Sequence, residues 1–390
     1  SVAALFCRRA LQQQDIVLLA LSLWTIAAGI RFLQKPTVPR GLLFALAGAL
    51  AANIRVVGFF VFGVMGITAI LKLAVRRELT KQAWGSGIAA ILGFVGIYTL
   101  LTPAFLVNPS EFITHILSNT TAFSRWTGVV IFKGVVYDPT AGLPLPHSYL
   151  PTMIALTVPV AVLVLAAVGG VYAVVLCIKK DRRRPVLLAL MVLWIVPVAY
   201  AVFARPLMYN GWRHFYFLYG PIVIMAGFGL LLIGKLLSGS RMGKVAGTAA
   251  LVLVLLWQGL GIACNYPYEY AYYNELADNA QTDFELDYWE VSTLNAVRQL
   301  ADSSERNQEL PLVIGGGDHM SEFSLLQCVD MLPNAIRDSV TVTQEADPPY
   351  IFSNTTYAQI YSQWPQDDYK VLFTIESYGN VICTMYERQN

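Results

Sequence analysis

The chain carries, at residues 209–217, the stretch Tyr209-Asn210-Gly211-Trp212-Arg213-His214-Phe215-Tyr216-Phe217. It sets an arginine and a histidine among aromatic residues, directly before the apolar run Leu218 to Leu232. An ionisable pair at the end of a membrane helix is costly unless it has a partner there. The stretch therefore predicts a membrane helix that begins at a polar site.

Composition divides the chain into two unlike parts. Hydrophobic residues make up 56% of the 390 residues and charged residues 13%. Several apolar runs approach the length of about 20 residues that crosses a bilayer. Residues 1–264 hold 5 acidic and 22 basic residues, whereas residues 265–390 hold 20 acidic and 5 basic ones. This asymmetry predicts a membrane region with basic cytoplasmic loops joined to an acidic aqueous domain, and it does not favour nucleic-acid binding.

The apolar runs predict an α-helical polytopic membrane protein with about eight membrane segments. The expected segments cover residues 16–30, 41–54, 56–71, 84–107, 152–178, 186–204, 218–232 and 245–264. Arg55 separates the second and third runs, and the basic flanks of this pair favour a helical hairpin that turns at Arg55. Pro109 to Trp126 suits the membrane surface, and Tyr137 to Pro151 is expected to be a loop.

Basic loops predict the orientation of the chain in the membrane. The loops expected on the cytoplasmic side are 31–40, 72–83, 179–185 and 235–244. Residues 106–151, residues 209–217 and everything after residue 264 are then extracytoplasmic. This orientation brings Asp15, Arg55, Arg213 and His214 to the same outer face.

Residues 265–390 predict a small extracytoplasmic α/β domain. Strand-like runs lie at 310–314, 350–353, 369–375 and 381–386, and residues 292–303 fit a helix. The stretch Gly315-Gly316-Gly317-Asp318-His319 lacks the Lys-Ser/Thr of a P-loop and the spacing of a dinucleotide fingerprint. A plain strand-to-helix turn is therefore favoured over a phosphate loop.

The four histidines are scattered, so we expect no histidine-based metal site. Five cysteines are too few for a disulfide framework, and a disulfide between Cys328 and Cys383 stays open. Two triplets, Asn119-Thr120-Thr121 and Asn354-Thr355-Thr356, fit the pattern of N-glycosylation acceptors, which also occurs by chance.

Each charged residue at the outer face also has a purely structural interpretation. Arg55 can extend to lipid headgroups, Asp15 can be a charge at a helix N-terminus, and Arg213-His214 can anchor the chain at the interface. Together, two cations and one carboxylate suit a lipid-linked phosphate. The arginines would bind the anion, and the carboxylate would orient or deprotonate a hydroxyl.

Aromatic and acidic residues alternate in two stretches that follow the last apolar run, Tyr266 to Leu276 and Phe284 to Trp289. They are typical either of an interfacial aromatic belt or of a rim that binds sugars, because ring faces and carboxylates suit polyhydroxyl ligands. The candidate substrate-rim residues are Tyr209, Tyr273, Asn274, Glu285, Asp287 and Trp289.

These stretches resemble signature sequences of polytopic glycosyltransferases related to the dolichyl-phosphate-mannose protein mannosyltransferases and the lipid A aminoarabinose transferase. The resemblance is carried by Tyr209 to Phe215, Tyr266 to Tyr270, Tyr273 to Leu276, Phe284 to Trp289, Gln14-Asp15, Asn53-Ile54-Arg55 and Ser148 to Pro151 before Thr157-Val158-Pro159.

The resemblance implies the glycosyltransferase C fold, with an active site at the extracytoplasmic face. It implies transfer of a sugar from a polyprenyl-phosphate donor to an acceptor hydroxyl, usually with inversion. In that family the main catalytic carboxylate lies on the first extracytoplasmic loop. This chain has no match for that loop, which is expected before residue 1, and Asp15 would correspond to an accessory acidic position.

We therefore expect residues 1–264 to form the C-terminal part of a transferase bundle in a bacterial inner membrane or the endoplasmic reticulum. Arg55 and Arg213 would hold the donor phosphate, while Asp15 and His214 would organise the acceptor or the base. The expected partners are membrane lipid, the lipid-linked sugar, and another chain or an N-terminal segment that supplies the first-loop carboxylate. No cofactor is expected besides the polyprenyl-phosphate sugar as donor substrate.

The alternative is a non-catalytic membrane subunit whose acidic outer domain docks a partner. A transporter is disfavoured, because few charges lie inside the apolar runs where a transport path would need them.

Overall fold

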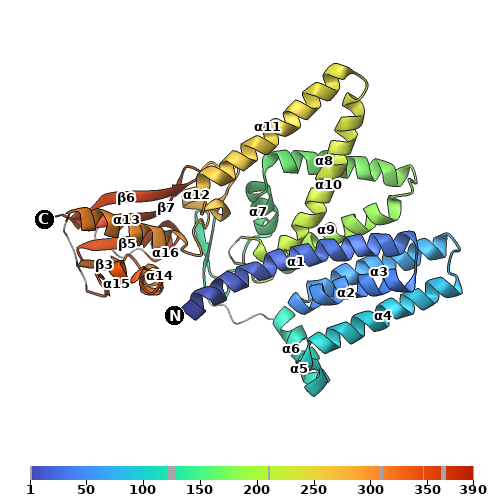
Figure 1. The fold of residues 1–390 in the computed structure, drawn as a ribbon, viewed down its shortest axis with the longest axis horizontal. Helices are drawn as coiled ribbons and strands as arrows, with labels where there is room; N and C mark the ends of the chain where they lie inside the picture. Colours follow the sequence, from blue (N-terminus) through green and yellow to red (C-terminus); the bar gives the residue numbers. More distant parts are fainter. Residues whose placement is uncertain are drawn as a thin grey trace.

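The computed structural model describes residues 2–121, 128–209, 211–307, 311–345, 347–361 and 366–389. It contains a bundle of helices and, at one end of that bundle, a domain built on a five-stranded sheet (Figure 1). This arrangement confirms the expected order of a helical region followed by a C-terminal α/β region.

The helical region contains eleven α-helices and one 3-10 helix, η1, among the described residues. Their bounds are α1 Val2–Gln34, α2 Val38–Ile54, α3 Val57–Val75, α4 Lys81–Leu101, α5 Pro103–Val107, α6 Pro109–Thr121, α7 Tyr149–Thr157, α8 Val160–Ile178, α9 Arg184–Ala204, η1 Arg213–Leu218, α10 Tyr219–Leu237 and α11 Arg241–Asn265. The hairpin β1 (Val130–Phe132) and β2 (Val135–Tyr137) lies between the bundle and the sheet domain.

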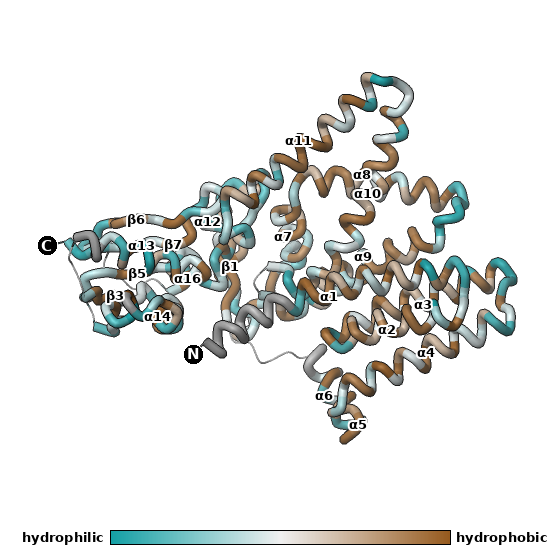
Figure 2. The backbone as a smooth tube through the Cα atoms, viewed as in Figure 1, coloured by the Kyte–Doolittle hydropathy of each residue, from teal (hydrophilic) through white to brown (hydrophobic). Residues whose placement is uncertain are grey.

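Within the described ranges, seven helices are long and apolar enough to cross a membrane, namely α1 from Gln14, α3, α4, α8, α9, η1 with α10, and α11. Helix α2 is apolar but has 17 residues, so one of the eight expected segments is short. Figure 2 shows apolar colouring along these helices and polar colouring at their turns. The turns α1–α2, α3–α4 and α8–α9, which carry basic residues, lie at the end far from the sheet domain (Figure 1).

Prolines overturn two of the expected boundaries. The segment expected at 84–107 ends at Leu101, because Pro103 starts the separate helix α5. The segment expected at 152–178 is broken at Pro159, whose ring and missing N–H end α7 and begin α8. Helix α7 also starts at Tyr149, inside the expected loop 137–151. The expected surface segment forms α6, and its residues 122–126 lie outside the described part of the chain.

The hairpin expected at Arg55 is confirmed. Helix α2 ends at Ile54, Arg55 is extended with φ −151° and ψ 148°, and α3 begins at Val57. The turn is so tight that a Cβ on Gly58 would lie 2.2 Å from the backbone nitrogen of Ala52. Glycine is therefore required there, and the turn fixes Arg55 at the end of the bundle.

Helices α8 and α10 also pack through glycine. A Cβ on Gly169 would lie 1.8 Å from the carbonyl oxygen of Met225, and one on Gly229 would lie 2.2 Å from that of Leu165. Small residues let helix backbones approach closely, which is how helices associate where lipid removes the hydrophobic driving force. This contact holds the middle of α10, the helix that continues from η1, against α8.

The sheet domain orders its strands β4-β3-β5-β7-β6. Strand β3 pairs in parallel with β4 and β5, while β7 pairs antiparallel with β5 and β6. The bounds are η2 Glu269–Ala271, α12 Ala280–Asp283, α13 Ser292–Asn307, β3 Leu312–Gly316, α14 His319–Val329, α15 Asn334–Arg337, β4 Val340–Thr343, β5 Tyr350–Asn354, α16 Thr355–Tyr361, η3 Gln366–Asp368, β6 Tyr369–Ser377 and β7 Asn380–Arg388.

Helices α13 and α14 pack on the sheet around buried residues such as Val297, Leu325, Phe352 and Met385. The glycine stretch forms the end of β3 and leads into α14, as the favoured interpretation predicts. Asp318 caps that helix, because its carboxylate accepts hydrogen bonds from the backbone N–H of Met320 and Ser321 at 2.9 and 3.0 Å.

Cys328 and Cys383 form no disulfide with each other; both are buried thiols. Burial raises the pKa of the Cys383 thiol to about 12. At neutral pH Cys383 is therefore an inert part of the core.

Asn274 joins the sheet domain to the bundle at the break between α7 and α8. Its side-chain amide donates to the carbonyl oxygens of Ala155 and Val158, both at 2.7 Å. Its backbone N–H donates to Leu156 at 2.7 Å. Pro159 has no N–H to give to Ala155, four residues earlier, so Asn274 supplies the donor that the proline removes.

Replacement of Asn274 by alanine should therefore uncouple the two parts. Two buried carbonyl groups would lose their donors, which should lower the free energy of unfolding by about 1–3 kcal/mol. Thermal unfolding and limited proteolysis of the purified chain would measure the loss. Asn380→Ala is a matched control, since among the described residues the Asn380 amide donates only to the Tyr378 carbonyl in its own turn. Equal effects of the two changes would contradict the role of Asn274 in joining the sheet domain to the bundle.

Candidate functional site

Asp15 lies between two arginines at the end of the bundle that faces the sheet domain. Its Oδ1 lies 2.5 Å from Nη2 of Arg55, and its Oδ2 lies 3.3 Å from Nε of Arg213. Asp15 belongs to α1, Arg55 to the α2–α3 turn and Arg213 to the first position of η1. Three segments far apart in sequence thus meet at one carboxylate, and three of the residues predicted from the sequence come together.

Burial makes this pairing necessary. The side chains of Asp15, Arg213 and Arg55 are 9%, 14% and 25% exposed. A charge that is largely removed from water must be paired, and removing one partner of a buried pair is strongly destabilising. One carboxylate faces two guanidinium groups, so Asp15, Arg55 and Arg213 together keep a formal charge of +1.

Part of each guanidinium group stays available to a ligand. The contact of Arg213 with Asp15 uses Nε, and the contact of Arg55 uses Nη2. Among the described residues, the terminal nitrogens of Arg213 take part in no hydrogen bond or ion pair. Guanidinium edges of this kind bind phosphate oxygens in a bidentate manner.

Two aromatic rings hold Arg213 in place. The guanidinium carbon lies 5.3 Å from the centre of the Tyr209 ring and 5.0 Å from that of Trp289. Both distances fall within the range of cation–π attraction. Because Trp289 follows the last membrane-length helix, the sheet domain contributes directly to a site in the bundle.

His214 lies in the same cluster. Its imidazole contacts the Tyr209 ring edge-on, with the two ring centres 4.8 Å apart. It also lies close enough to Arg55 and Arg213 to interact electrostatically with both guanidinium groups. Its Nδ1 is buried and has no hydrogen-bond partner among the described residues. His214 therefore presents a buried polar atom inside the site that no group in the described part of the chain satisfies.

A second group of rim residues surrounds Glu285. The Tyr273 hydroxyl donates to the backbone carbonyl of Glu285 at 3.2 Å, and the Tyr149 hydroxyl donates to that of Gly211 at 3.2 Å. Burial, and then the charge of Glu285, raise the pKa of both phenols well above the usual value. The Glu285 side chain thus lies near both phenols and close to the Gly211–Arg213 segment.

Tyr149 was not among the residues selected from the sequence. It does lie within the stretch Ser148 to Pro151 that carries part of the family resemblance, and that stretch was the available signal.

Asp287 and Asn274 have structural roles, although the sequence suggested them as rim residues. Asp287 is fully buried and caps α13, accepting hydrogen bonds from the backbone N–H of Val291 and Ser292 at 2.9 and 3.2 Å and from the Ser292 hydroxyl. The Asn274 amide is committed to the carbonyls of the α7–α8 break. Neither side chain is available to a ligand in this conformation.

Asn354 is likewise engaged. It is buried, its amide nitrogen donates to the Asp287 carbonyl at 2.9 Å, and its oxygen accepts from the Thr356 N–H at 2.9 Å. This triplet cannot be glycosylated in the folded domain, and the side chains of the triplet at Asn119 lie outside the described ones.

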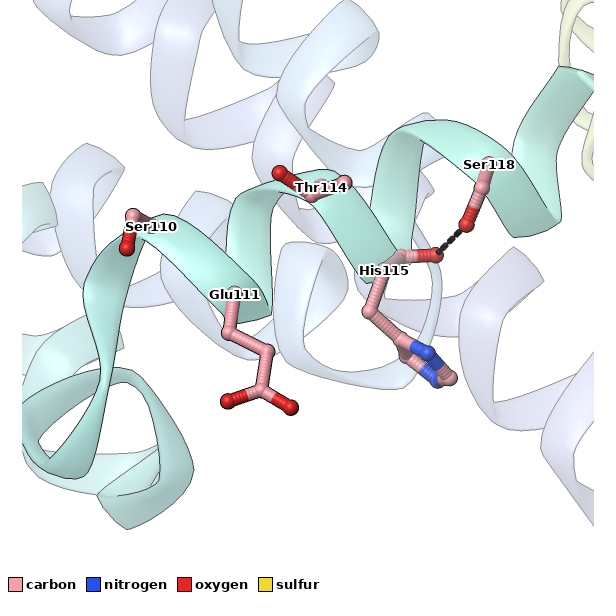
Figure 3. Close-up of a pocket in the computed structure, with 5 residues that line it drawn as sticks. All are labelled: Ser110, Glu111, Thr114, His115 and Ser118. Atoms are coloured by element: carbon pink, nitrogen blue, oxygen red, sulfur yellow. Dashed lines mark hydrogen bonds between the residues drawn. The ribbon is translucent and has the colours of Figure 1, made fainter.

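Across the described part of the chain, no three His, Cys, Asp or Glu side chains gather as metal ligands would. A shallow depression of about 430 Å³ lies elsewhere, on α6. Figure 3 shows its side chains, Ser110, Glu111, Thr114, His115 and Ser118, along a single helix. It lacks the convergence of groups from several elements that marks the Asp15 cluster.

The contact between Trp289 and Arg213 can be measured by substitution. Trp289→Leu should lower the free energy of unfolding by about 1–2 kcal/mol more than Trp289→Phe, which keeps an aromatic face for the cation. Thermal or denaturant unfolding would report the difference. In an Arg213→Ala background the two variants should become equal; a difference that persists there would contradict the cation–π contact.

Asp287 predicts a pH dependence of stability. Burial raises its pKa from 3.8 to about 7. The folded state therefore binds the proton more tightly than the unfolded state, and stability is lost as the pH rises from about 4 to about 7. The free energy of unfolding should fall by roughly 4 kcal/mol over this range relative to Asp287→Asn, whose amide oxygen can still cap the helix. If the free energy of unfolding changed with pH to the same extent in the unmodified protein and in Asp287→Asn, the prediction would be wrong.

No protein-family model matches the chain, no curated protein matches it, and no solved structure matches it. The resemblance to polytopic glycosyltransferases rests on the quoted sequence stretches, and it stays a prediction.

Proposed function

We propose that this chain belongs to an integral-membrane glycosyltransferase that moves a sugar from a polyprenyl-phosphate donor to an acceptor hydroxyl at the extracytoplasmic face. The observation that carries the proposal is the meeting of Arg55 and Arg213 on Asp15, with guanidinium nitrogens still available, at the end of membrane-length helices.

The position of the arginines suits a phosphate that is attached to a lipid. Arg55 follows α2 directly, and Arg213 begins the segment that continues into α10. A polyprenyl chain would lie along the apolar helix surfaces, while its phosphate would sit at the helix ends. The formal charge of +1 on the three residues is complementary to the single negative charge of a phosphodiester.

The chemistry follows from this placement. The acceptor hydroxyl oxygen forms a bond to the anomeric carbon of the sugar, and the bond from that carbon to the phosphate oxygen breaks. The polyprenyl phosphate leaves as an anion that Arg55 and Arg213 stabilise, and the hydroxyl proton passes to a carboxylate. Asp15 is committed to both arginines, so we assign it to holding them, and the proton acceptor is a different carboxylate.

The proposed orientation follows from the charged ends of the bundle. The basic turns α1–α2, α3–α4 and α8–α9 lie at the end far from the sheet domain, and the basic α10–α11 turn lies at the top of the view in Figure 1. The chain after residue 264 carries most of the acidic residues. With the basic turns in the cytoplasm, the Asp15 cluster and the sheet domain face outward.

Substitution of the arginines tests the proposal. In the full-length protein, Arg55→Ala and Arg213→Ala should each reduce sugar transfer from a polyprenyl-phosphate donor by about 100-fold or more, since each removes a charged contact with the leaving phosphate. Transfer of a radiolabelled sugar in membranes is the measurement.

Arg205→Ala is the matched control, because Arg205 lies at the end of α9, is exposed and takes part in no ion pair among the described residues. It should leave transfer unchanged. Undiminished transfer in both Arg55→Ala and Arg213→Ala would overturn the phosphate role.

A further inference from the structure

A row of aromatic rings runs from the Arg213 site across the sheet domain. The ring centres of Tyr209 and Tyr288 are 6.3 Å apart, those of Tyr288 and Tyr357 6.4 Å, and those of Tyr357 and Tyr361 6.4 Å. His319 ends the row, 4.5 Å from Tyr361. The rings come from the segment before η1, from the segment before α13, from α16 and from α14, so the fold, not the local sequence, lines them up.

Part of the row is packed in the interior and part is exposed. Tyr209 packs against the buried cluster of the bundle, and Tyr357 is 7% exposed. The Tyr357 and Tyr361 rings are nearly parallel, at 13°, whereas the other two tyrosine pairs are tilted by 31° and 42°. Tyr288, Tyr361 and His319 retain solvent exposure, and none of them belongs to a hydrophobic cluster among the described residues.

One hydrogen bond joins two members of the row. The Tyr357 hydroxyl donates to the Tyr288 carbonyl at 3.0 Å, so the buried ring of Tyr357 holds the backbone at Tyr288. Trp289, next to Tyr288, contacts Arg213 and thereby links the row to the cluster of Asp15, Arg55 and Arg213.

Carboxylates lie near the outer end of the row. Asp318 precedes His319 directly, and the charges of Asp318 and Asp138 act on the Tyr361 phenol. Both carboxylates already accept hydrogen bonds within their own turns, Asp318 from Met320 and Ser321 and Asp138 from Thr140 and Ala141. The exposed ring faces, which can pack against the C–H groups of a sugar ring, therefore carry the complementarity to a carbohydrate.

We propose that this row, from Tyr209 through Tyr288 to Tyr361 and His319, binds a carbohydrate chain and delivers its end toward Arg213. As an acceptor site it rests on the proposed transferase function, since it makes the acceptor a saccharide and not a polypeptide. Binding of carbohydrate to the row does not depend on transfer.

Direct binding therefore tests the inference separately from activity. Short gluco-, manno- and galacto-oligosaccharides would be titrated into the purified full chain without any donor, following the fluorescence of the tryptophans, which include Trp289. At least one of these series should bind. Tyr361→Ala and His319→Ala should each weaken that binding by about five- to tenfold, as expected when one ring contact is lost, and Tyr361→Phe should restore it.

Two controls separate the possible outcomes. Tyr270→Ala removes an exposed tyrosine outside the row and should leave binding unchanged. Arg55→Ala should reduce transfer by about 100-fold or more but keep oligosaccharide binding, so failure of the proposed function and failure of this binding site give different results. Unfolding curves would show that each variant is folded.

The inference is overturned if none of the oligosaccharides binds, or if binding survives both Tyr361→Ala and His319→Ala. It is also overturned if a serine- and threonine-containing peptide binds the row in place of the saccharides.

Discussion

The ion pairs of Asp15 with Arg55 and Arg213 are the interaction on which the site depends. They join α1, the α2–α3 turn and η1 across most of the bundle, at distances of 2.5 and 3.3 Å. Each of these charges would be costly alone in its partly buried position. Because one carboxylate holds two cations, the bundle keeps an excess positive charge at a fixed point near its surface. That excess charge suits the binding of an anion, and it follows from the fold alone.

The sheet domain completes this arrangement. Asn274 replaces the hydrogen-bond donor that Pro159 removes from α7, and Trp289 lies against Arg213. The break between α7 and α8 is thus a docking point, because its carbonyl groups have lost their intrahelical donor and require one from elsewhere. A domain fixed in this way can place the Trp289 ring against Arg213. Through Tyr288 it also extends the row of aromatic rings from Tyr209 into the sheet domain.

Much of the architecture could be predicted from the sequence, because apolar runs and basic loops act locally. The turn at Arg55 followed from the basic flanks of its two helices. The break at Pro159 was missed, since the run around it is uniformly apolar and the compensating donor, Asn274, is more than a hundred residues away. Asp287 was taken for a rim residue, because an aromatic-acidic stretch does not show which carboxylate caps a helix. The contacts of Arg213 depend on tertiary packing that the sequence does not display.

The central claim is that Arg55 and Arg213 form a binding site for a lipid-linked phosphate. Phosphorus-31 NMR of a short-chain polyprenyl phosphate, titrated with the purified chain in detergent, tests it most directly. The account predicts a shifted or broadened phosphate resonance with the unmodified chain and an unperturbed resonance with the Arg55→Ala/Arg213→Ala double variant. The same perturbation with both proteins would contradict it, because the phosphate would then bind elsewhere.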